Sequence, residues 1–218
     1  ALQSDPDELL AESAHALSTG CPLSAHIVWQ QQRRARKLSL RQALQKGSEV
    51  LKRGGSALSA VRMAVRTMED CPLFNAGKGA VLNFQGGHDL DASIMDGKTL
   101  KAGAVANIRN VKNPVELAYI IMKKSKYVML SGTDALDYAL ENGLKIEDSE
   151  YFRTEMRYKQ WLKARGSDHM FLDHDTPVDD KKFGTVGAVA RDKRGNLAAA
   201  TSTGGLVNKR YGRIGDSP

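Results

Sequence analysis

Two threonines in the last fifth of the sequence, Thr185 and Thr203, have the type and spacing for nucleophilic chemistry. They lie in two short runs of small, β-prone residues, 184–190 and 197–203, and the turn-forming residues 192–196 separate these runs. Such a pattern predicts a β-hairpin, with a glycine in the turn at a positive φ angle. Pairing that is symmetric about Arg194 would place Thr185 directly opposite Thr203. Two hydroxyl groups would then face each other at the open end of the hairpin.

A threonine hydroxyl needs an adjacent base to act as a nucleophile, and the α-amine of an N-terminal threonine is one such base, with a pKa of about 7.7 to 8.0. Thr185 is internal, so it must first be released by attack of its own hydroxyl on the carbonyl of Gly184. Glycine favours this attack because it lacks a Cβ and tolerates strained backbone angles. The alternative is structural, because threonine pairs across neighbouring strands are common in sheets.

The elements that must position these threonines follow from capping residues, glycines and hydrophobic periodicity. The order of helices and strands predicts a layered α/β or α+β domain. Helices are expected over 5–17, 39–53, 56–69, 113–124, 133–142 and 150–165, strands over 100–111 and 127–130, and glycine-rich loops with short strands over 71–103.

The composition is that of a globular protein, with 218 residues, 41% of them hydrophobic and 26% charged. No apolar run has the length of a membrane span, and the N-terminus does not resemble a secretion signal, so a cytoplasmic location is expected. The two cysteines do not indicate a disulfide framework or a zinc site. The net charge of +7 raises nucleic-acid binding as a hypothesis, but the dense basic cluster Arg33–Lys37 has no aromatic residues beside it, and a solvated helix face is the simpler interpretation.

Several motifs together resemble the plant-type L-asparaginase and isoaspartyl aminopeptidase family of N-terminal-nucleophile hydrolases. The resemblance covers about residues 39–218. Its motifs are Pro72-Leu73-Phe74-Asn75-Ala76-Gly77-Lys78-Gly79, Leu90-Asp91-Ala92-Ser93-Ile94-Met95-Asp96-Gly97, Lys101-Ala102-Gly103-Ala104-Val105-Ala106, Gly184-Thr185-Val186-Gly187-Ala188-Val189, Ala200-Thr201-Ser202-Thr203-Gly204-Gly205, and Gly212-Arg213-Ile214-Gly215-Asp216-Ser217-Pro218.

The resemblance implies an αββα sandwich that cleaves itself between Gly184 and Thr185. It then implies hydrolysis of L-asparagine, of β-aspartyl (isoaspartyl) dipeptides, or of both. Thr185 would be the nucleophile and Thr203 would position it. The chain divides accordingly into a segment unlike the family, 1–38, an α-subunit-like region, 39–184, whose residues 166–183 form an exposed linker, and the start of a β-subunit-like region, 185–218.

Ligand-binding roles also follow from the resemblance. Arg213 and Asp216 would hold the α-carboxylate and α-amine of the substrate, and Asn75 would lie near the nucleophile. No catalytic metal is expected, and the family's assembly implies a homo-oligomer of cleaved chains. A structural sodium ion is implied on the backbone carbonyls of Met68, Glu69, Cys71, Phe74, Ala76 and Lys78.

Two departures from the family pattern lead to a competing hypothesis. The family's His-Gly-Gly-Ala-Gly-like start has no counterpart in residues 1–37, so a central strand would be missing or replaced. The Thr-Gly segment of the family's oxyanion hole has no counterpart before Pro218. The alternative is therefore a catalytically inactive, truncated homologue that acts as a structural or interaction protein, and a nucleic-acid-binding protein is the third hypothesis.

Overall fold

One six-stranded sheet organises the protein, whose computed structural model describes residues 25–26, 36–165 and 184–217. The strand order is β1-β5-β6-β2-β3-β4, and all neighbours are antiparallel except β3 and β4. The strands are β1 (Ala25–His26), β2 (Leu90–Asp96), β3 (Lys101–Ile108), β4 (Met129–Ser131), β5 (Val186–Arg191) and β6 (Leu197–Thr203).

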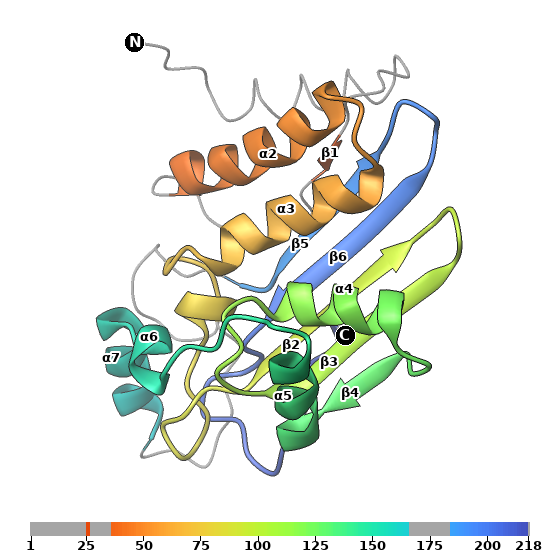
Figure 1. Cartoon of the computed structure of the whole chain (residues 1–218). Helices are drawn as coiled ribbons and strands as arrows, with labels where there is room; N and C mark the ends of the chain where they lie inside the picture. The colour runs from red at the N-terminus through yellow and green to blue at the C-terminus, as the bar shows by residue number, and fades with distance from the viewer. Residues whose placement is uncertain (1–24, 27–35, 166–183, 218) are drawn as a thin grey trace.

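The longest helices cover one face of this sheet (Figure 1). Helix α3 packs on β5 and β6, α4 packs on β2 and β3, and α2 packs on α3. None of the described helices is long and apolar enough to cross a membrane. The helices are α2 (Arg36–Lys52), α3 (Ala57–Glu69), α4 (Pro114–Lys124), α5 (Gly132–Glu141), α6 (Ser149–Phe152) and α7 (Glu155–Ala164), and Gly77–Gly79 form a short 3₁₀ helix, η1.

The strands alternate between a buried face and an open face, as a half-covered sheet requires. Ile94, Ala188 and Ala200 lie in the core beneath the helices. On the opposite face Met95 and Leu197 are 42% and 60% exposed. The mixed α/β class is confirmed, and the part of the chain that the structure describes holds a single sheet of the expected sandwich.

The β5–β6 hairpin has the predicted register. Val186 pairs with Ser202, and Ala190 pairs with Ala198, which is symmetric about Arg194. Residues at even positions of both strands face the helices, and the odd positions of β6, including Thr203, therefore lie toward the open face.

The turn of this hairpin is built around one buried carboxylate, Asp192. Its Oδ1 accepts hydrogen bonds from the backbone N–H groups of Arg194 (2.9 Å) and Asn196 (3.0 Å). Its Oδ2 accepts from the backbone N–H of Ala57, the first residue of α3 (3.4 Å). Gly195 has φ +82°, as the turn prediction required. The turn length and its attachment to α3 together fix the pairing of the two strands.

The expected helix 150–165 is wrong as a single element, because it is interrupted at Arg153 and Thr154. Thr154 has extended backbone angles, and its side chain accepts from the N–H of Arg157, so it caps a new helix, α7. Helix α2 begins at Arg36, before the predicted start at Ser39. The helix expected over 5–17 and the linker 166–183 lie outside the described residues.

Strand β1 lies within the segment in which no family strand was recognised. Ala25 and His26 pair with Ala190 and Val189 of β5, antiparallel. The segment 1–37 therefore contributes a short edge strand next to the strand that follows Thr185.

Candidate active site

The hairpin brings the two predicted threonines into direct contact. The hydroxyl of Thr185 donates to Oγ1 of Thr203 at 2.8 Å, and the backbone N–H of Gly205 donates to the same Thr203 oxygen at 3.0 Å. Thr203 is 1% exposed, whereas Thr185 is exposed to solvent. A fixed, buried hydroxyl thus orients a solvent-accessible one, which is the arrangement that the sequence predicted.

Asn75 holds the other side of the Gly184–Thr185 bond. Its backbone N–H donates to the Gly184 carbonyl oxygen at 3.3 Å, and its own carbonyl accepts from the N–H of Gly204 at 3.0 Å. Its side chain is also fixed, because Nδ2 donates to the Gly205 carbonyl (2.8 Å) and Oδ1 accepts from the Val81 N–H (3.0 Å). Asn75 therefore ties its loop to the end of β6 and places a donor on the carbonyl that Thr185 would attack.

Gly204 allows this close approach. A Cβ at this position would lie 2.5 Å from Asn75 Oδ1 and 2.8 Å from the Cβ of Ala80. Any side chain would push Asn75 away from the hairpin, so the glycine is required for packing rather than for flexibility.

The segment with the predicted substrate-binding residues lies against Thr203. A Cβ at Gly215 would lie 3.5 Å from Thr203 Cγ2, and the Ser217 carbonyl accepts from the hydroxyl of Thr201 at 2.6 Å. Arg213 is partly exposed and Asp216 is exposed. No ion pair joins these two residues in the described structure, so both charges can be offered to a ligand with a charged amine and carboxylate.

The loop expected to bind sodium curls around two glycines. A Cβ on Gly77 would lie 2.5 Å from the Glu69 carbonyl oxygen, and a Cβ on Gly79 would lie 2.1 Å from that of Phe74 and 2.5 Å from that of Pro72. Gly77 also has φ +50°. The carbonyl oxygens of Glu69 and Phe74, two of the expected ligands, thus lie close to these two glycines, and hard cations prefer oxygen ligands of this kind.

Three further positions of the expected ligand set lie along the same loop. The Cys71 and Ala76 carbonyls accept one backbone hydrogen bond each, from Phe74 and Gly79, whereas the Met68 carbonyl accepts from both Asp70 and Cys71. The Cys71 and Ala76 carbonyl oxygens therefore retain a second lone pair for a cation. For the sixth position, Lys78, the structure shows the ammonium 4.9 Å from the centre of the Tyr151 ring. The described residues contain no cluster of His, Cys, Asp or Glu that could hold a metal.

A group of buried charges near the site was not predicted. Asp89, Asp91 and Lys209 are 7%, 0% and 2% exposed. Burial raises the pKa of Asp89, but hydrogen bonds from Asn83 and Arg109, together with the positive charges of Arg109 and Lys209, outweigh this effect and hold the pKa below its usual value. The only available signal was the presence of Asp89 and Asp91 at the start of a mainly apolar run that ends at Met95, and periodicity does not reveal their partners.

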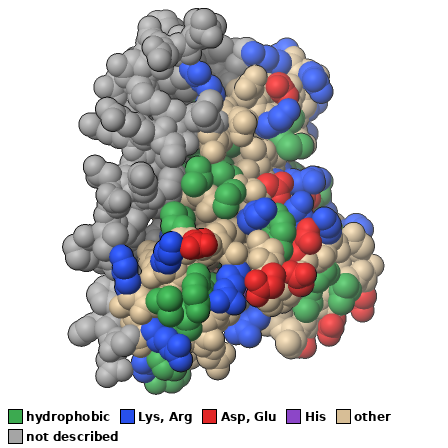
Figure 2. All heavy atoms as spheres, turned by 90° about the vertical axis from the view of Figure 1, so that its left-hand side faces the viewer, with side chains coloured by type: hydrophobic (Ala, Val, Ile, Leu, Met, Phe, Trp, Pro, Cys, Tyr) green, Lys and Arg blue, Asp and Glu red, His purple; other side chains and the backbone are tan. Residues whose placement is uncertain are grey.

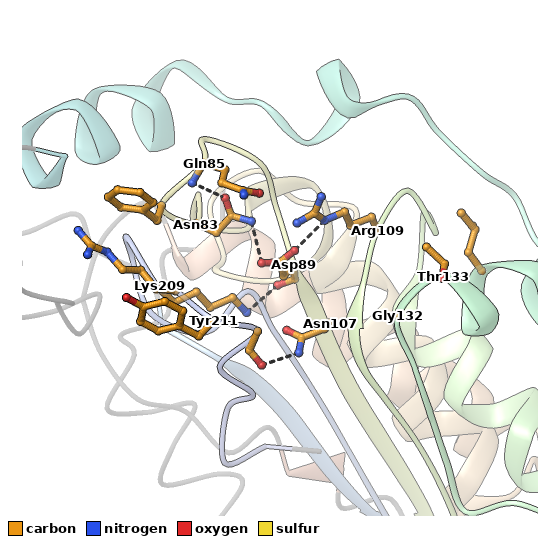
Figure 3. Close-up of a pocket in the computed structure, with 13 residues that line it drawn as sticks. Asn83, Gln85, Asp89, Asn107, Arg109, Gly132, Thr133, Lys209 and Tyr211 are labelled. Carbon is orange, nitrogen blue, oxygen red and sulfur yellow. Dashed lines mark hydrogen bonds and ion pairs between the residues drawn. The ribbon is translucent and has the colours of Figure 1, made fainter.

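Two of these charged residues, Asp89 and Lys209, line one side of a cavity of about 560 Å³ (Figure 3). In the figure Asp89 lies between Asn83 and Arg109, and Lys209 reaches it from the other side. The lining residues include none of the predicted catalytic or substrate-binding residues. Neither threonine lines the cavity, although Gly212, which precedes Arg213, does.

The nucleic-acid hypothesis gains no support from the surface. The side chains of Arg33–Lys37 lie outside the described part. On the face that Figure 2 presents, Lys and Arg side chains are interspersed with Asp and Glu. A basic stripe that could follow a phosphate backbone is not seen on that face.

Comparisons with known proteins identify the family to which the chain is similar. A family model described as asparaginase matches residues 17–218, which include part of the segment 1–38 that the motifs left outside the resemblance. An isoaspartyl peptidase of Salmonella typhimurium is 52% identical over 182 residues, 83% of this chain and 58% of that protein. An isoaspartyl peptidase/L-asparaginase of Mus musculus is 49% identical over 176 residues, 81% of this chain and 53% of that protein. The chain thus spans about half the length of the curated relatives it matches.

Proposed function

The chain belongs to the asparaginase family, and we propose that it carries the nucleophile of a threonine amidohydrolase that activates itself by cleavage between Gly184 and Thr185. The observation that carries this proposal is the 2.8 Å contact between the hydroxyls of Thr185 and Thr203, next to a scissile carbonyl that already accepts the Asn75 N–H.

Self-cleavage would begin with attack of Thr185 Oγ on the Gly184 carbonyl carbon. The negative charge that develops on the carbonyl oxygen is stabilised by the Asn75 N–H, in the manner of an oxyanion hole. The C–N bond breaks, the nitrogen gains a proton, and Gly184 is left as an ester on Thr185. Water hydrolyses the ester and leaves a carboxylate on Gly184 and a free α-amine on Thr185.

The free amine then supplies the base that the hydroxyl lacked. It takes the Thr185 hydroxyl proton as Oγ attacks the side-chain amide of the substrate, and it passes that proton to the leaving amine. Asparagine would release ammonia, and a β-aspartyl dipeptide would release its second amino acid. Water hydrolyses the resulting β-aspartyl ester, which releases aspartate.

Arg213 and Asp216 suit a substrate that carries both a carboxylate and an ammonium group. Arg213 can bind a carboxylate through two parallel N–H groups, and Asp216 can accept from an ammonium. Their unpaired state in the described structure supports this role. Such anchoring would hold the reacting amide near Thr185.

We also propose that the loop from Met68 to Lys78 holds one sodium ion through backbone carbonyls. Bound sodium would fix the loop that carries Asn75, and through it the donor on the Gly184 carbonyl. The ion has a structural role in this proposal and takes no part in bond breaking.

The test is the intact mass of the purified protein over time, together with asparagine and β-aspartyl dipeptide assays. The wild type should split between residues 184 and 185 and release aspartate from at least one substrate. Thr185→Ala should stay whole and inactive, whereas Thr67→Ala, a matched change on the exposed side of α3, should behave as the wild type. Activity that survives in Thr185→Ala would refute the proposal, and a chain that neither splits nor turns over substrate would favour the inactive homologue.

A further inference from the structure

The segment Gly212–Ser217, which presents Arg213 and Asp216, is held by side chains of the sheet at fixed points. Asn107 Nδ2 donates to the Gly212 carbonyl at 2.6 Å, as Figure 3 shows. The Gly215 N–H donates to Asp91 Oδ2 at 3.0 Å. These two anchors lie on either side of Arg213, so its backbone position depends on them.

Asp91 serves both anchors with one carboxylate. Its Oδ1 accepts from the backbone N–H of Asn107 at 2.8 Å, while Oδ2 accepts from Gly215. Asn107 lies where the β2–β3 pairing shifts register, and it has φ +51°, an unusual angle for a residue other than glycine. The Asp91 carboxylate therefore replaces a backbone partner at this irregularity and holds Asn107 in position to bind Gly212.

Asp91 also lies beside the catalytic strand. It is the Cα partner of Thr203 in the β2–β6 ladder, and it is fully buried. Asp91 thus pairs with Thr203 through its backbone and holds the Arg213 segment through its side chain. It therefore links the position of this segment to that of Thr203, which contacts the nucleophile Thr185.

The negative charge of Asp91 is balanced by Lys209. The Lys209 ammonium is 3.9 Å from Asp91 Oδ2 and donates to the Asp89 carbonyl oxygen at 3.1 Å. Burial lowers the pKa of Lys209, and the carboxylates of Asp91 and Asp89 oppose this effect. A Cβ on Gly205 would lie 3.0 Å from the ammonium nitrogen, so the lysine is packed beneath the loop that follows Thr203.

We propose that Asp91 is a positioning residue that fixes the Arg213–Asp216 segment relative to Thr185 and thereby determines substrate affinity. The inference rests on the proposed amidohydrolase function. It assigns no contact between Asp91 and the substrate, because Asp91 acts through Gly215 and Asn107.

The test compares Asp91→Asn with Asp89→Asn. Both replace a buried carboxylate with an amide, but in the described structure the Asp89 side chain makes no hydrogen bond to residues 212–217 and binds Asn83 and Arg109 instead. In Asp91→Asn the new NH₂ group must face one of two backbone N–H donors, so one anchor is lost. We expect KM for asparagine or β-aspartyl dipeptide to rise about tenfold or more in Asp91→Asn, with kcat changed much less. KM should be unchanged in Asp89→Asn.

Two readouts separate positioning from general damage. Self-cleavage should proceed in Asp91→Asn, because the hydrogen bonds that Thr185, Thr203 and Asn75 make at the scissile bond involve no residue of the anchored segment. Hydrogen exchange should show loss of protection at the Gly215 amide and none at β5. Unchanged KM and unchanged Gly215 protection, or a lower kcat with unchanged KM, would overturn the inference.

Lys209→Met in the Asp91→Asn background tests the effect of leaving the Lys209 ammonium without the Asp91 carboxylate. Asp91→Asn leaves the buried ammonium without its nearest carboxylate, so a lower melting temperature is expected, and removing the ammonium as well should recover part of it. KM should stay high in the double variant, and its return to the wild-type value would overturn the inference. If the wild type turns over neither substrate, the proposed function fails, and Gly215 protection still decides the role of Asp91.

Discussion

Raising the pH from 6.5 to 8 is expected to lower the free energy of unfolding through the ionisation of one carboxyl group, that of Glu69. This residue ends α3 and is 0% exposed. Its Oε1 accepts from the Val115 N–H at 2.9 Å, but within the described structure Oε2 has no hydrogen-bond partner. Burial raises the pKa of Glu69 to about 8, so the group is protonated in the folded protein at neutral pH.

The sign and size of the effect follow from proton linkage. The folded protein holds the Glu69 proton up to about pH 8, whereas the unfolded chain releases it near pH 4.5. Between these values the folded state binds one more proton, so the free energy of unfolding falls by up to about 1.4 kcal/mol per pH unit as the pH rises. Burial lowers the pKa of His88 to about 4. Between pH 4 and 6.5 this residue makes the free energy of unfolding rise with pH, which offsets the decrease caused by Glu69. Above pH 6.5 the loss from Glu69 should be about 2 kcal/mol by pH 8.

Urea unfolding at pH 6.5 and pH 8 measures this loss, in a Thr185→Ala background that keeps the chain in one piece. Glu69→Gln is the matched variant, because its amide oxygen can accept from Val115 and the side chain cannot ionise. The protein with Glu69 should lose about 2 kcal/mol of unfolding free energy over this interval, and the Gln variant should lose much less. Equal losses in both proteins would show that Glu69 is not the titrating group.

Two further outcomes are expected. Thr203→Val keeps the shape of the side chain but removes the oxygen that accepts the Thr185 hydroxyl, so self-cleavage measured by intact mass should slow about tenfold or more; a rate equal to that of the wild type would show that Thr203 does not orient the nucleophile. Replacing 100 mM sodium chloride with choline chloride should lower the free energy of unfolding by about 1.4 kcal/mol for a dissociation constant of about 10 mM, and identical melting curves in the two salts would argue against the sodium ion.

The sequence was sufficient for the hairpin and its threonine pair because the information there is local. A turn of known length between two short runs determines which residues oppose each other, and Gly195 marks the turn. The contact between Thr185 and Thr203 follows from that register alone. Similarly, Gly54 and Ser56 predict that α3 begins after them, and in the structure the Ser56 side chain caps the helix by accepting a hydrogen bond from the Ser59 N–H.

The network around Asp91 was not predictable in this way. Its partners Asn107, Lys209 and Gly215 are distant in sequence, and no spacing rule links them. A buried charge also resembles a surface charge until its burial is known. The break between α6 and α7 was missed for a related reason, because Thr154 is compatible with a helix interior and becomes a cap only through its local backbone geometry.

The length of the hairpin turn, 192–196, determines which residues pair at a site seven residues away along each strand. One inserted residue between Asp192 and Asn196 would shift the pairing of β5 and β6 by one position, and Thr185 would no longer oppose Thr203. At about 3.4 Å per residue, the change would occur roughly 24 Å from the two threonines. Turns at a protein surface usually vary in length without consequence, but here the length itself determines the contact between the two threonines on which the proposed function rests. Homologues with a longer turn should therefore carry a compensating bulge in one strand or have lost the nucleophile.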